Sequence, residues 1–324
     1  MERIEYHLVQ RYVGRWGQTG WWRPVVGLIV GVLLMLVAQL VSLVGFAAYF
    51  LASGSDDVGG RLEALSDTAH VSPSLLAYLN LSLAAAIPVA LFLTRALHGL
   101  PPGWVTSVAG RIRWRWMLVT FGLAFVALLA TVVVGSFVPA AGDPADSSGG
   151  LNSWTSTTRD FVLVIVLLTP LQAAGEEFAF RGYLTQAFGG LFAPLGANAS
   201  RAFAVLLPSV LFALAHGAQD APVFFDRLAF GLVAGVLVIA TGGLEAGIAM
   251  HVLNNFLAYG FALAFSDMTT ALNPTGGSWW TLPTTLTQSL VYLGLSIWAA
   301  RRMGISTQAD HRAPNVLEAS EPRV

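Results

Sequence analysis

The chain has 324 residues and a net charge of −1, with 55% hydrophobic and only 11% charged residues. In soluble domains about a quarter of the residues are charged, so this composition argues against a soluble protein. It predicts an all-α, polytopic membrane helix bundle in a lipid bilayer. The small net charge predicts no nucleic-acid partner, and the absence of cysteine excludes disulfides, thiolate metal sites and a cysteine nucleophile.

Eight apolar runs approach or exceed the roughly 20 residues that a helix needs to cross a membrane. In chain order they are Pro24–Ala52, Pro73–His98, Arg115–Ala141, Asp160–Phe188, Ser200–Gly217, Pro222–Ala240, Leu244–Phe265 and Pro283–Ala300. The first run lacks a short apolar stretch that ends at a small-residue cleavage site, so we interpret it as a retained helix and not a signal peptide. The sequence thus predicts about eight transmembrane helices.

Arginines and acidic residues alternate between the loops that join these runs. The arginine-rich segments contain Arg3, Arg11, Arg15 and Arg23, then Arg111, Arg113 and Arg115, then Arg201, and finally Arg301 and Arg302. The other loops contain Asp56, Asp57, Glu63, Asp67, Asp143 and Asp146. Because basic loops stay in the cytoplasm, we predict a multi-pass protein of the cell membrane with both termini cytoplasmic.

The fourth run contains Glu176, Glu177 and Arg181, although a charged side chain at the bilayer centre costs at least ~2.5 kcal/mol. Glu177 and Arg181 are four residues apart, so they share a helix face and can form an ion pair, which suits a structural role equally well. Glu176 is turned away from them by about 100° and has no partner on its own helix. A buried, unpaired glutamate suits a general base.

Two further runs each contain one histidine. His216 ends the fifth run, four residues after Phe212, and His251 shares a helix face of the seventh run with Asn255. A single intramembrane histidine is often only a hydrogen-bonding group between helices. Two histidines together with an unpaired glutamate and an asparagine favour a shared site, and the rise of about 1.5 Å per residue allows them to lie at one depth. Glu245, near a span end, is expected to reach the headgroups.

These residues form three motifs in a fixed order. "EEFAFR" (Glu176–Arg181) is an EExxxR motif, "FALAH" (Phe212–His216) is FxxxH, and "HVLNN" (His251–Asn255) is HxxxN. In this order, on separate spans, they resemble the CAAX-protease and bacteriocin-processing (Abi) family of intramembrane proteases. The resemblance covers roughly Asp160 to Phe265.

The resemblance implies an intramembrane endopeptidase that acts on a protein or peptide in the membrane. It implies that Glu176 and His216 activate a water molecule, and that His251 and Asn255 stabilise the oxyanion. It also implies that Glu177 and Arg181 hold the fourth helix in shape and that Phe212 packs beside His216. The expected organisation is a cytoplasmic segment 1–23, N-terminal membrane helices 24–158, a catalytic core 159–265, a last membrane helix 266–303 and a polar tail 304–324. We expect the tail to be disordered.

Three alternatives remain open at this point. Zinc at Glu176, His216 and His251 has suitable ligand types, although we favour a reaction without a metal or cofactor. A non-catalytic immunity or scaffold protein of the same family is the leading alternative to the enzyme. A transporter is disfavoured because we find no internal repeat. The sequence does not identify the substrate.

Overall fold

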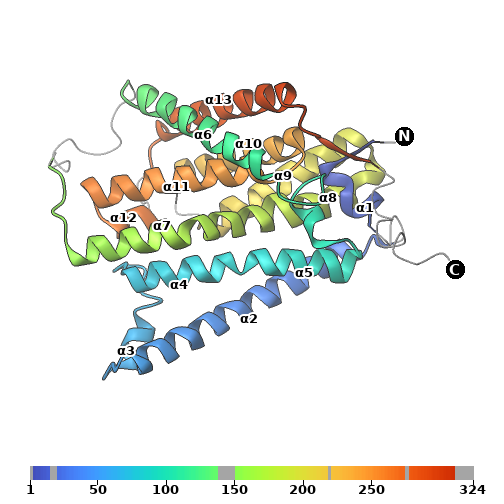
Figure 1. Ribbon diagram of the computed structural model, residues 1–324. Coiled ribbons are helices and arrows are strands. Elements are labelled where there is room, and N and C mark those ends of the chain that lie inside the picture. The colour runs from blue at the N-terminus through green and yellow to red at the C-terminus, as the bar shows by residue number, and fades with distance from the viewer. Residues whose placement is uncertain (1–2, 15–19, 138–149, 218–219, 274–276, 311–324) are drawn as a thin grey trace.

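The computed structural model describes residues 3–14, 20–137, 150–217, 220–273 and 277–310. Long helices lie side by side along one axis (Figure 1). In the described part of the chain, seven helices are long and apolar enough to cross a membrane. The prediction of an all-α, polytopic membrane bundle is therefore confirmed.

The long elements follow the predicted runs closely. They are α2 (Arg23–Ala52), α4 (Pro73–Ala84), α5 (Ala86–His98), α6 (Trp114–Gly135), α7 (Ser156–Glu176), α9 (Ala197–Ala215), α10 (Ala221–Thr241), α11 (Glu245–Phe265) and α13 (Thr281–Arg302). Two differences concern length and continuity. The second run is divided into α4 and α5, and the fourth continues through a π-helix, η4 (Glu177–Leu184), into α8 (Thr185–Phe192) and η5 (Ala193–Leu195).

The shorter elements gather at the two ends of the bundle (Figure 1). They are β1 (Arg3–Glu5), η1 (Tyr6–Leu8), α1 (Val9–Tyr12), α3 (Val58–Glu63), η3 (Pro102–Val105), α12 (Met268–Leu272) and β2 (Gln308–Asp310). We call the end that contains β1, β2 and η3 the basic end, and the end that contains α3 and α12 the acidic end.

The eighth predicted span lies in a helix that is less apolar than the other seven. Residues 283–300 do lie in a helix, α13, which packs against α6 and α10, but α13 is not among the helices apolar enough to cross a membrane by composition. Its polar side chains explain the difference, because Gln288, Ser289 and Ser296 are buried against the bundle. Leu290 and Trp298 are exposed on its other face, where lipid can cover them.

Local signals explain where the helices begin. The Thr155 hydroxyl accepts from the Thr158 backbone N–H and starts α7 with a capping box. Ser72 caps α4, whose first residue is Pro73, and the Asp220 carboxylate accepts from the backbone N–H of Val223 at the start of α10. These side chains satisfy backbone donors that a helix start would otherwise leave unpaired.

The N-terminal and C-terminal segments meet at the basic end. β1 and β2 form an antiparallel pair in which Ile4 lies opposite Ala309. The first residues of the predicted disordered tail are therefore ordered, and residues 311–324 lie outside the described part of the chain. Arg201 forms an ion pair with Glu5, and its hydrogen bond lowers the pKa of Glu5. Burial lowers the pKa of neighbouring His7 to about 4.

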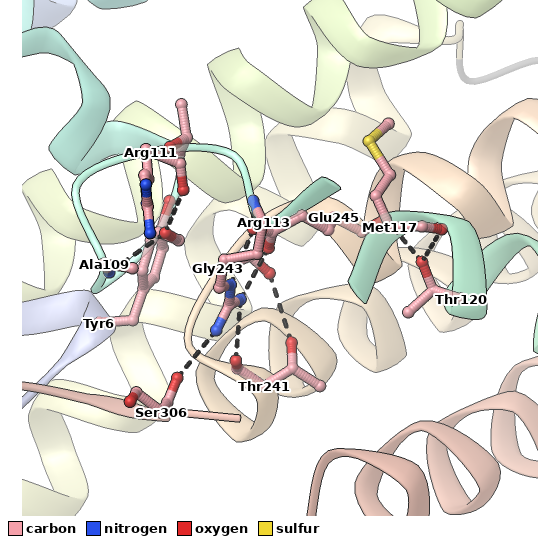
Figure 2. A network of polar contacts seen from close by, with 12 residues as sticks. Tyr6, Ala109, Arg111, Arg113, Met117, Thr120, Thr241, Gly243, Glu245 and Ser306 are labelled. Atoms are coloured by element: carbon pink, nitrogen blue, oxygen red, sulfur yellow. Dashed lines mark hydrogen bonds and ion pairs between the residues drawn. The ribbon is translucent and has the colours of Figure 1, made fainter. Parts of the chain in front are cut away.

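A second ion pair joins the loop before α6 to the turn between α10 and α11. Arg113 donates from Nε to Glu245 Oε1 at 2.8 Å and from Nη2 to Oε2 at 2.7 Å. Figure 2 shows the same guanidinium reaching the backbone carbonyls of Thr241 and Ser306. Glu245 is fully buried, so the expectation that it reaches the headgroups is wrong: a bidentate arginine partner lets it stay inside.

Removing either partner of this pair should destabilise the protein strongly. Glu245→Gln leaves the Arg113 guanidinium without its anion, and breaking a buried pair costs about 3–5 kcal/mol. We expect both Glu245→Gln and Arg113→Gln to lower the melting temperature in detergent. The melting temperature of the double variant should fall by less than the sum of the two single decreases, because neither charge is then left without its partner. A melting temperature of Glu245→Gln equal to that of the wild type would contradict this role.

Candidate active site

The fourth membrane helix changes its winding at the glutamate pair. α7 ends at Glu176, and the next eight residues form the π-helix η4, which the sequence gave no reason to expect. π-helical turns are rare and are frequently found at functional sites. Gly175 brings this region close to its neighbour, because a Cβ atom there would lie 2.3 Å from the backbone oxygen of Leu83. α7 is therefore packed tightly against α4 immediately before the two glutamates.

Glu177 is the centre of a buried ionic cluster. Its Oε1 atom lies 3.1 Å from Arg181 Nη1 and 2.9 Å from His251 Nδ1. The side chains of Glu177 and Arg181 are 0% and 1% exposed. The guanidinium of Arg181 also lies over the ring of Phe212, with 4.1 Å from Cζ to the ring centroid. The predicted i,i+4 pair thus forms, and it binds α11 as well.

The contact with Glu177 sets the orientation of the His251 ring. A carboxylate can only accept a hydrogen bond, so Nδ1 of His251 carries the donated proton. Nε2 then points to the other glutamate and lies 3.4 Å from Glu176 Oε2. One imidazole therefore bridges two adjacent carboxylates that a regular helix would turn apart.

Glu176 faces the second histidine in the same way. His216 Nε2 lies 3.8 Å from Glu176 Oε2, and His216 Nδ1 donates to the backbone carbonyl of Phe212 at 2.8 Å. Nε2 of neutral His216 is consequently an acceptor. Glu176 is 6% exposed, and its Oε2 accepts no hydrogen bond from the residues that the structure describes. Three acceptor atoms therefore converge where a proton or a water molecule would satisfy them.

Asn255 completes the group of predicted residues. Its Nδ2 donates to Gln172 Oε1 at 3.1 Å, which leaves the second amide N–H available. The three sequence motifs do not include Gln172, although it lies one helical turn before Glu176 on α7. The structure thus brings Glu176 close to His216 and His251, and Asn255 lines one cavity together with the two histidines.

A cavity of about 110 Å³ adjoins these side chains, large enough for several water molecules. It is lined by groups from α7, α9, α10, α11 and α12, among them Gln172, Phe212, His216, Arg227, Phe230, His251, Asn255 and Tyr259. Phe212 packs on His216 with ring centroids 4.3 Å apart, as expected, and Phe230 meets the edge of His251 at 5.4 Å. Phe230 and Tyr259 belong to no motif, so only the fold reveals them.

The donor types of Glu176, His216 and His251 suit zinc. Among the described residues, however, no group of three or more His, Asp or Glu side chains is arranged to hold a metal ion.

The comparisons with known proteins agree with the motifs. Residues 158–257 match the family model described as Type II CAAX prenyl endopeptidase Rce1-like. This segment belongs to the CAAX-protease family. The matched segment contains all seven residues of the predicted site and ends two residues after Asn255. The predicted resemblance is therefore confirmed for the second half of the bundle.

One relative is similar over a longer part of the chain than residues 158–257. Uncharacterized protein YyaK of Bacillus subtilis (strain 168) is 24% identical over 263 residues, which cover 73% of this chain and 84% of that protein. No solved structure matches the chain.

The two glutamates should affect stability differently. Glu177→Gln leaves Arg181 buried without its anion, so it should cost about 3–5 kcal/mol and lower the melting temperature in detergent. Glu176→Gln removes no arginine partner and keeps the side-chain shape, so the melting temperature should change little. Exchanging Glu177 and Arg181 together for uncharged residues should be milder than the sum of both single changes. Equal losses for Glu176→Gln and Glu177→Gln would refute the division of roles.

Proposed function

We propose that this protein is an intramembrane endopeptidase that hydrolyses a peptide bond of a membrane-associated protein or peptide. The observation that carries the proposal is the convergence of Glu176 Oε2 and the Nε2 atoms of His216 and His251 beside a polar cavity. We assign the catalytic core to residues 159–265, and we propose a cell-membrane location with both termini in the cytoplasm.

The first chemical step is the attack of water on the peptide carbonyl. A water molecule between Glu176 and His216 donates one proton to the Glu176 carboxylate as its oxygen bonds to the carbonyl carbon. His216 accepts a hydrogen bond from the same water through Nε2, since Nδ1 is committed to the Phe212 carbonyl. The proton on Glu176 then passes to the departing amide nitrogen as the carbon–nitrogen bond breaks.

The oxyanion formed in this step needs hydrogen-bond donors. Asn255 supplies its second amide N–H, and His251 donates from Nε2 when its ring carries both protons. The Glu177 carboxylate on Nδ1 stabilises that positive ring at 2.9 Å. Arg181 and Phe212 act one contact further away, because they hold Glu177 and His216 in place.

Two features support an enzyme over a non-catalytic protein of the same family. His216, His251 and Asn255 line one cavity, and Glu176 Oε2, which accepts no hydrogen bond from the described residues, lies 3.4 Å from His251 Nε2 and 3.8 Å from His216 Nε2. The family whose model matches is described as a prenyl endopeptidase, which gives the reaction class. For the substrate of this chain we propose only its class, a membrane-associated protein or peptide.

Replacing the proposed base tests the function directly. Glu176→Gln should lower the cleavage rate by roughly 10²–10⁴-fold, the usual size of a general-base contribution, at an unchanged protein level. Comparative membrane proteomics of cells that contain the wild type or Glu176→Gln should reveal an uncut substrate that accumulates in the variant. Purified protein and a peptide that spans the mapped cleavage site then give the rate.

The matched control is Glu63→Gln, the same exchange at an exposed position of α3 far from the site. It should retain far more activity than Glu176→Gln. If wild-type and Glu176→Gln membranes show the same proteins, and the purified wild type cleaves none of their peptides, the non-catalytic alternative replaces the proposal.

A further inference from the structure

We propose that the cavity receives its substrate from the extracytoplasmic face of the membrane. The substrate would then be a peptide segment of a membrane-anchored protein that is exposed on the outer surface. That the entering peptide is a substrate rests on the proposed function. The direction of access is a property of the cavity and can be measured without turnover. Four observations carry the inference: the charges of the two ends, the walls of the cavity, the lengths of α10 and α11, and the packing on the basic side of the site.

The two ends of the bundle differ in charge. Described arginines of the basic end are Arg3, Arg11, Arg23, Arg95, Arg111, Arg113, Arg115, Arg201, Arg301 and Arg302, with Glu5, Glu245 and Asp310 as its described acids. At the acidic end the described acids are Asp56, Asp57, Glu63, Asp67, Asp160, Asp220, Asp226 and Asp267, and the described arginines are Arg61, Arg159 and Arg227. Because arginine-rich ends remain in the cytoplasm, the acidic end faces outward.

The cavity walls lead from the histidines toward the acidic end. Val223 and Arg227 come from the first two turns of α10, and Ala258 and Tyr259 from the second half of α11. Ala271 and Leu272 of α12 line the cavity as well, and α12 lies at the acidic end (Figure 1). No residue of β1, β2 or η3 contributes to this lining.

The helices beside the site differ in length on the acidic side. Phe230 of α10 and His251 of α11 are in ring contact and mark the level of the site. From that level α11 continues to Phe265, about 21 Å, whereas α10 reaches back only to Ala221, about 14 Å. On the acidic side of the site, α10 is therefore shorter than α11.

The basic side of the site is closed by packed side chains. Tyr6, Leu100, Trp104, Val105 and Leu244 are all buried in one apolar cluster. The same cluster includes Phe178 and Val252, the chain neighbours of Glu177 and His251. The Tyr6 hydroxyl donates to the Val105 carbonyl, and the Arg113–Glu245 pair fixes the turn between α10 and α11 across this end (Figure 2). A peptide from the cytoplasm would have to disrupt this cluster.

Cysteine labelling tests the direction of access, because the chain contains no cysteine of its own. Ala258→Cys places a thiol on the cavity wall, where residue 258 is exposed. Ala69→Cys and Ala109→Cys are controls at exposed positions of the acidic and the basic end. Intact cells are treated with a membrane-impermeant maleimide, and the same reagent is then applied to permeabilised cells.

We expect Ala258→Cys and Ala69→Cys to react in intact cells and Ala109→Cys to react only after permeabilisation. Labelling of Ala258→Cys only after permeabilisation, or no labelling under either condition when the denatured protein does react, would overturn the proposal. Labelling of Ala109→Cys in intact cells would overturn the assigned orientation and the proposal with it.

The same variants separate this inference from the proposed function. The labelling pattern should be unchanged in a Glu176→Gln background, so a loss of cleavage leaves the access result intact. When cleavage is measurable, treatment of intact cells that contain Ala258→Cys should block it, whereas treatment of cells with Ala69→Cys should not. If the treatment blocks cleavage in cells with Ala69→Cys but not in cells with Ala258→Cys, access through the cavity is also contradicted.

Discussion

The arrangement of the whole site depends on one buried carboxylate. Glu177 holds Arg181 on its own helix and His251 on α11, so it joins two membrane helices at a single oxygen atom. Taking these charges out of water is costly, and the cost is met only because each group finds its partner. The same contact decides which nitrogen of His251 faces Glu176. The reactivity proposed for Glu176 is thus organised by a neighbour that does not line the cavity.

Much of this could be predicted from the sequence because the membrane simplifies the problem. Long apolar runs must form helices when no water can satisfy the backbone, so α2, α9, α10 and α11 appear within a few residues of the predicted limits. Intramembrane charges are rare enough to be examined singly. Glu176, His216 and His251 could therefore be selected from the sequence, and their order on the chain pointed to the family that the comparison later matched.

Other features depend on contacts that leave no periodic signal. The π-helix contains Glu177 and Arg181, which contact α11 and Phe212, and a helix pattern in the sequence cannot distinguish it from an α-helix. Gln172 and Phe230 acquire a role only when distant helices meet. Glu245 misled the prediction, because composition alone does not show which polar side chains are turned inward to a partner.

The pairing of β1 with β2 has a consequence for biosynthesis. Strand Arg3–Glu5 is made first, but its partner Gln308–Asp310 follows roughly 300 residues later, which takes about 15–60 s at typical elongation rates. During that interval seven apolar helices enter the membrane while the N-terminal strand waits without its partner. The pairing of the two strands at the basic end can consequently form only after α13 has been made, so this contact is among the last of assembly.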